Sequence, residues 1–175
     1  MVLPGHIAAG DLTTYTVLAV TSYALTPDQH LLLLLAGTAL GDAPDIDILY
    51  YFLKRKAVGP SGLSKHRTYI THTPLLWLLL GLIIFFCSTN DFGRTLGLLV
   101  WLCPWSHLLC DSISTGVMWL WPFSKKQYAL YSEKISIFSN WRGLFRHYIT
   151  TPLAWVEISL TFLGFSVFIH TLLSH

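Results

Sequence analysis

The chain has 175 residues, of which 53% are hydrophobic and 11% are charged, whereas about a quarter of the residues of a soluble domain are charged. This composition excludes an ordinary soluble domain, and the formal net charge of +2 is too small to indicate direct binding of nucleic acid. We expect an all-α, polytopic membrane helix bundle with about five short transmembrane helices, forming a single domain over residues 1–175.

The first two predicted spans, residues 12–25 and 30–43, are short. Thr and Ser dilute the first, and the second combines a run of leucines with small residues that allow close helix packing. The segment before them lacks the pattern of a cleaved signal peptide, so we expect it to be retained. It contains His6, which follows Pro4-Gly5 in a short segment that can fold back over a site.

An acidic segment, Gly41-Asp-Ala-Pro-Asp-Ile-Asp47, ends the second span. Pro44 disfavours a helical residue before it, so we expect the chain to break here and to present the acids on a turn. Asp45 and Asp47 are candidate metal ligands, and the choice between them is open. The carboxylate that stays off the metal, or Asp42, is a candidate general base. The alternative is an Asp-rich helix stop at the membrane surface.

The segment from His66 to Pro74 leads into the third predicted span, residues 75–87. Two histidines six residues apart cannot share one face of a straight helix, so we expect His66 in the loop and His72 near the first turn. Both are candidate metal ligands, although His66 can also be an ordinary residue of a basic loop. The planar guanidinium of Arg67 can hold a phosphate oxygen or a carboxylate.

The fourth predicted span, residues 95–109, runs into His107-Leu-Leu-Cys-Asp111. Positions i and i+4 of a helix project from one face, so this pair can bind one metal ion. Ionisable residues near a membrane span are costly and indicate function. The alternative is a neutral histidine bonded to an aspartate that joins two helices. The fifth span, residues 152–173, carries one acid, Glu157, which can support the site or pair with a nearby arginine.

The basic residues separate the two sides of the predicted bundle. All but one of the 11 lysines and arginines lie between spans two and three or between spans four and five. The positive-inside rule places both loops in the cytoplasm, with the N-terminus, in a multi-pass protein of the inner (cytoplasmic) membrane. Every candidate site residue then lies at the cytoplasmic face of the membrane.

The candidate ligands are nitrogen and oxygen donors, because the three cysteines show no spacing that suggests a metal site. Histidine and carboxylate ligands favour zinc, or manganese or iron where carboxylates dominate. The donors exceed what one tetrahedral ion requires, so we expect one or two divalent ions. The expected ligand set is His6, Asp45, Asp47, His66, His72, His107 and Asp111.

The order of these motifs resembles that of the YdjM-like family, whose members are described as inner-membrane-associated, LexA-binding, metal-dependent hydrolases. The resemblance extends to about Pro122. It implies hydrolase activity and LexA as a cytoplasmic protein partner. The same order is distantly similar to zinc-dependent phospholipase C, which implies a mononuclear or dinuclear site. Only Glu157 offers a counterpart to the later ligands of that group.

The resulting hypothesis is a membrane-bound, phospholipase-like hydrolase that cleaves a phosphoester of a membrane lipid with metal-activated water. Asp42, Asp47 and Arg67 are its candidate catalytic residues. One alternative is a non-catalytic metal-binding protein that recruits a cytoplasmic regulator such as LexA. Another is a transporter, because ionisable groups in spans also mark ion pathways.

Overall fold

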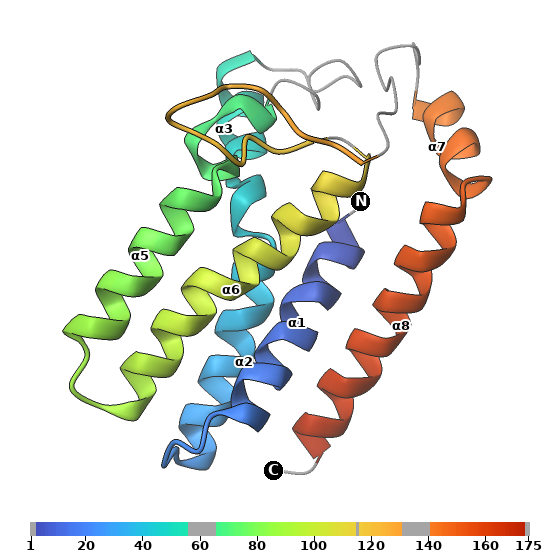
Figure 1. The fold of residues 1–175 in the computed structure, drawn as a ribbon. Coiled ribbons are helices and arrows are strands. Elements are labelled where there is room, and N and C mark those ends of the chain that lie inside the picture. Colours follow the sequence, from blue (N-terminus) through green and yellow to red (C-terminus); the bar gives the residue numbers. More distant parts are fainter. Residues whose placement is uncertain (1–2, 56–65, 115, 131–140, 174–175) are drawn as a thin grey trace.

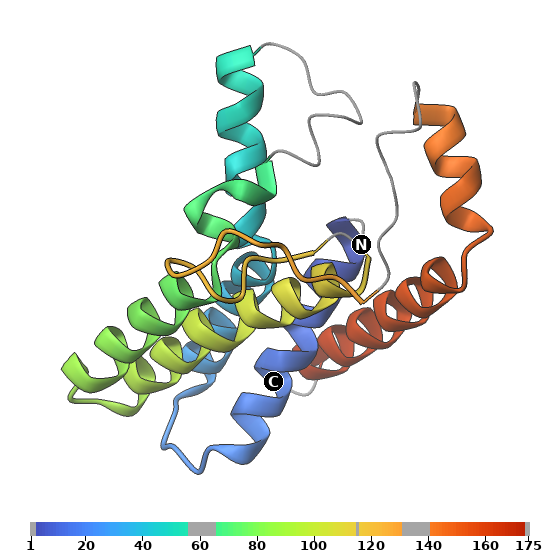
Figure 2. The ribbon, with the colours of Figure 1, turned by 45° about the horizontal axis from the view of Figure 1, so that its top comes forward.

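The computed structural model describes residues 3–55, 66–114, 116–130 and 141–173, whose regular elements are helices. Long helices run side by side along a common axis (Figure 1), while shorter helices gather at one end (Figures 1 and 2). The long helices are α1 (Leu3–Val20), α2 (Pro27–Gly41), α5 (Pro74–Cys87), α6 (Asp91–Ser114) and α8 (Pro152–Leu173). The short ones are η1 (Ala43–Asp45), α3 (Ile46–Arg55), η2 (His66–Thr68), η3 (Ile70–His72) and α7 (Trp141–Ile149).

The predicted all-α class is confirmed for the described residues. Two helical segments, 91–113 in α6 and 154–173 in α8, are long and apolar enough to cross a membrane. Helix α5 is more apolar than α6 and α8 but has only 14 residues. The buried share of the α8 segment is 11%, against 39% for the α6 segment. Helix α8 therefore lies at the periphery of the bundle, with most of its apolar surface exposed.

The first two helices begin earlier than the predicted spans. Helix α1 begins at Leu3 instead of residue 12, because Pro4 is well suited to a first helical turn and Ala8 and Ala9 continue the helix. His6 therefore lies within α1 and not in a segment that folds back. Helix α2 begins at Pro27, where Thr26 and Gln29 form a capping box.

The helices approach closely where glycines face each other. A Cβ atom on Gly41 would lie 2.9 Å from the Cα of Gly10, and a Cβ on Gly81 would lie 2.6 Å from the carbonyl oxygen of Gly97. These contacts join α1 to α2 and α5 to α6. A buried core of Val17, Leu33, Leu99 and Cys103 fills the space between α1, α2 and α6. The helix ends are thereby held in fixed relative positions.

Candidate metal centre

His107 and Asp111 lie one turn apart on α6, and both side chains are fully buried. The Nδ1 atom of His107 is 2.9 Å from the carbonyl oxygen of Gly41, at the end of α2. A carbonyl oxygen can only accept a hydrogen bond, so Nδ1 carries a proton, and in the neutral ring Nε2 carries the lone pair. Nε2 makes no hydrogen bond to any described residue. This nitrogen is thus prepared to bind a cation.

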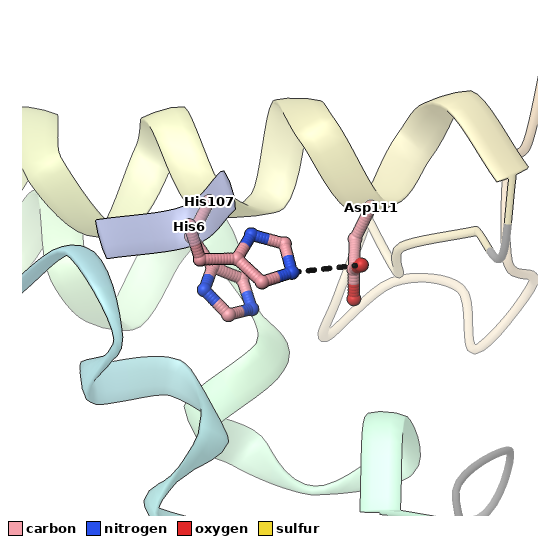
Figure 3. Close-up of side chains that lie close together, drawn as sticks. All are labelled: His6, His107 and Asp111. Carbon is pink, nitrogen blue, oxygen red and sulfur yellow. Dashed lines mark ion pairs between the residues drawn. The ribbon is translucent and has the colours of Figure 1, made fainter. Parts of the chain in front are cut away.

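His6 joins this pair from the first turns of α1. Its ring stacks on the ring of His107, with 3.6 Å between the ring centroids, and its Nε2 atom lies 3.6 Å from Oδ1 of Asp111 (Figure 3). One ligand atom from each of these three buried residues lies within 4.8 Å of those of the other two. Residues 6, 107 and 111 therefore form one group that can hold a metal ion.

A second group shares His107. It adds Asp45 from η1 and His72 from η3, and its ligand atoms also lie within 4.8 Å of one another. Oδ1 of Asp45 is 3.2 Å from Nε2 of His72 and 3.5 Å from Nε2 of His107. Helix α2 has ended by this point, and Pro44 lies in the short η1 turn that carries Asp45. The predicted break in the helix is confirmed.

Asp47 lies beside His72 but in neither group. Its Oδ2 atom is 3.0 Å from Nδ1 of His72 and accepts a hydrogen bond of 2.8 Å from the hydroxyl of Thr71. A carboxylate on the far nitrogen of a histidine fixes the ring orientation and leaves the other nitrogen to face a metal. The geometry thus separates the two acids that the sequence left as alternatives.

Arg67 is bound to Asp111. Its Nε atom lies 2.5 Å from Oδ2 of the carboxylate and its Nη2 atom 3.3 Å from Oδ1. Both side chains are buried. The sequence predicted that the guanidinium of Arg67 binds either a phosphate or a carboxylate. In the structure it binds a carboxylate, that of Asp111.

Two groups outside the long apolar helices have shifted pKa values. Burial lowers the pKa of His72, but its hydrogen bonds to Asp45 and Asp47 outweigh burial and raise the value to about 9. Burial, followed by the negative charge of Asp45, raises the pKa of Asp42 to about 6. The Oδ1 atom of Asp42 is buried without a hydrogen bond to any described residue.

Glu157 is buried in α8, near the start of α1. It accepts a hydrogen bond from the hydroxyl of Tyr148 in α7, and a Cβ atom on Gly5 would lie 2.6 Å from its Cγ. The sequence analysis did not predict a role for Tyr148. The one feature that could have indicated such a role is the position of this residue just before the fifth predicted span. The side chain of His66 lies outside the described residues, so its assignment as a ligand stays a prediction.

The residues present fit a divalent ion. The two groups offer three imidazoles and two carboxylates, a set suited to zinc. Because His107 has one available nitrogen, it can bind only one ion directly. A second ion would then be held by those residues of the two groups that do not bind the first ion.

A family model described as YdjM inner membrane protein matches residues 1–174 of the chain. No curated protein and no solved structure matches it.

Proposed function

The chain belongs to the YdjM family of inner membrane proteins, and from this premise and its buried His/Asp cluster we propose that it is a metal-dependent hydrolase. The observation that carries the proposal is the shared position of His107 in two potential ligand groups. The Nε2 lone pair of this residue is held toward those groups by the hydrogen bond from Nδ1 to Gly41. A buried arrangement of this kind is costly near a membrane and is typical of a functional site.

His72, His107 and Asp45 would hold one ion, and His6 and Asp111 would hold a second, with His66 as a further ligand. When bound, zinc or a similar ion supplies water of lowered pKa and neutralises charge on phosphate oxygens. Asp42, whose raised pKa suits a general base, would accept a proton from water at its carboxylate. Asp47 orients His72, and Arg67 orients Asp111.

The proposed substrate is a phosphoester of a membrane lipid. The elements that carry the candidate ligands, namely the first turns of α1, the short η1 and η3, and the last turns of α6, lie at one end of the bundle (Figure 1). The basic loops at this end are predicted to reach the cytoplasm. In a protein with about five spans and a cytoplasmic N-terminus, this end faces the inner leaflet. A site that faces the inner leaflet meets the headgroup of a lipid without extracting the lipid from the membrane.

To test this function, the protein is purified in detergent, its bound metal is measured, and hydrolysis of glycerophospholipids is assayed. We expect one or two equivalents of metal and turnover that is lost in His107→Ala and Asp111→Ala. His170→Ala, an exposed histidine on α8, is the matched control and should keep both properties.

The competing function is a metal-binding membrane protein without turnover that recruits a regulator such as LexA. Metal that is bound and lost in the variants, without hydrolysis of any phospholipid, would favour this alternative. Metal-free wild-type protein would contradict both functions.

A further inference from the structure

The chain after α6 folds back on the turn of α6 that carries Asp111. The backbone N–H of Gly116 donates to the carbonyl oxygen of Asp111 at 3.0 Å, and that of Leu130 donates to the carbonyl oxygen of Ser112 at 2.8 Å. Both ends of residues 116–130, here called the 116–130 hairpin, are thereby attached to the last turn of this candidate span.

Internal bonds also hold the hairpin. Within it, Val117 and Tyr128 exchange two backbone hydrogen bonds. The indole N–H of Trp119 adds a further bond to α6, to the hydroxyl of Ser112. Gly116 enters the hairpin with φ of +88°, a value that side-chain-bearing residues rarely adopt. The hairpin therefore has a defined position relative to α6.

This hairpin exposes large apolar side chains beside two positive charges. Phe123 is 94% exposed, Leu130 is 86% exposed, and Leu120 is exposed as well. Lys125 and Lys126, also exposed, follow Phe123 after one intervening serine. Leaving such apolar area in water is costly, and apolar residues next to lysines are typical of segments that lie in a membrane interface.

Helix α3 repeats the pattern at the same end of the bundle (Figures 1 and 2). Ile46, Tyr50 and Leu53 are spaced four and three residues apart, so they share one helix face, and all three are exposed. The helix ends with Lys54-Arg55. Asp45 immediately precedes it, so α3 begins next to the potential ligands.

We propose that the 116–130 hairpin and α3 form a contact surface for anionic phospholipids in the leaflet on the side of the His/Asp cluster. Leu120 and Phe123 lie below the headgroups, and Lys125 and Lys126 bind lipid phosphates. The charge of this surface complements an anionic leaflet, to which each nearby lysine adds attraction. Because the hairpin is attached to α6, a candidate span, the membrane available to it is the one in which the protein resides. The proposal requires the membrane location but not the hydrolase activity.

The test places an environment-sensitive NBD fluorophore at Phe123→Cys in full-length protein, with Cys87→Ser to remove the exposed native thiol. The labelled protein is reconstituted in nanodiscs of phosphatidylcholine with increasing phosphatidylglycerol and with doxyl-labelled lipids as quenchers. The matched control is a label at Gln127→Cys, an exposed polar position of the same hairpin. We expect blue-shifted, quenched emission at position 123 and water-like emission at position 127.

Substitution of each lysine by glutamine is expected to raise about fivefold the phosphatidylglycerol content needed for half-maximal quenching. Water-like emission at position 123 at every lipid composition would overturn the proposal and leave the surface to a soluble protein partner. Quenching that is equal with and without phosphatidylglycerol would overturn the assignment to anionic lipid. Metal content and turnover are separate readouts, so failure here and failure of the hydrolase proposal are distinguishable.

Discussion

His107 acquires its special position from backbone and side-chain neighbours on several helices. The carbonyl oxygen of Gly41 in α2 accepts a hydrogen bond from Nδ1, and His6 of α1 stacks on the ring. The i, i+4 spacing with Asp111 could be predicted from the sequence, because helix periodicity is local. The contact between His107 and the Gly41 carbonyl could not be predicted, because every residue has a backbone carbonyl and only packing determines which one faces a histidine.

Replacing Arg67 by Gln should destabilise the metal-free protein by about 3 to 5 kcal/mol, because Asp111 would remain a buried charge without its guanidinium partner. Added zinc can supply the missing positive charge, so it should raise the melting temperature of Arg67→Gln more than that of the wild type. The measurement is thermal unfolding in detergent with chelator and with zinc.

Arg94→Gln removes an exposed arginine at the opposite end of α6 and is the control. It should leave the melting temperature unchanged both in chelator and with zinc. Equal melting temperatures for Arg67→Gln and wild type in chelator would show that the pair does not compensate the buried charge.

The metal-free protein should lose stability as the pH rises from about 6.5 to about 9. Asp45 and Asp47 raise the pKa of His72 to about 9 in the folded state, above its usual value of 6.5, so protonated His72 stabilises the fold. Thr71, which donates a hydrogen bond to Asp47, and the ring of His107 also lie near His72. This contribution is fully present below pH 6.5 and is lost as the pH passes through 9. Melting temperatures measured in chelator across this range should therefore decline.

His72→Gln should flatten that decline, whereas His170→Gln, at an exposed position, should leave it intact. A slope that is unchanged in His72→Gln would assign the pH dependence to another group.

At the scale of elements, close glycine contacts connect helix packing to the site. A Cβ atom on Gly41 would lie 2.8 Å from the carbonyl oxygen of His6, so α1 and α2 approach closely where both contribute to the cluster. The sequence predicted that small residues would permit such an approach. It did not predict that α1 begins early enough to include His6, because the apolar pattern of that segment is weak.

Gly41→Ala should therefore lower the affinity for zinc by about 10- to 100-fold, because it displaces the carbonyl that orients His107 and the α1 turn that carries His6. Zinc affinity is measured by competition with a chelating dye. Gly81→Ala is the matched control: it creates an equally short contact between α5 and α6, away from the cluster. We expect both variants to melt at lower temperature but only Gly41→Ala to lose zinc affinity. Equal zinc affinities in Gly41→Ala and Gly81→Ala would contradict the proposed connection between α1–α2 packing and metal binding.

At the scale of the whole molecule, the bundle has two distinct ends. One end holds the start of α1, the end of α6, and helices α3 and α7, and the other holds the turns between α1 and α2 and between α5 and α6 (Figure 1). The potential ligands belong to elements of the first end. The distribution of basic residues predicts that the first end is cytoplasmic.

Single cysteines at Lys56, Asp91 and Lys126 test this orientation in intact cells and inverted vesicles. A membrane-impermeant maleimide should label Asp91→Cys only from outside, and Lys56→Cys and Lys126→Cys only from the cytoplasm. Labelling of Asp91→Cys from the cytoplasmic side would reverse the orientation.

The sequence alone determined the helical class and the family, because long apolar stretches and the spacing of His and Asp motifs are local properties of the chain. It also identified most of the residues that gather at the cluster. Only the tertiary structure decided their partners: Asp45 faces His72 and His107, Asp47 lies behind His72, and Arg67 binds Asp111. The physical reason is that these contacts join segments far apart in the chain. Their geometry depends on how α1, α2 and α6 pack, and no local pattern in the sequence specifies that packing.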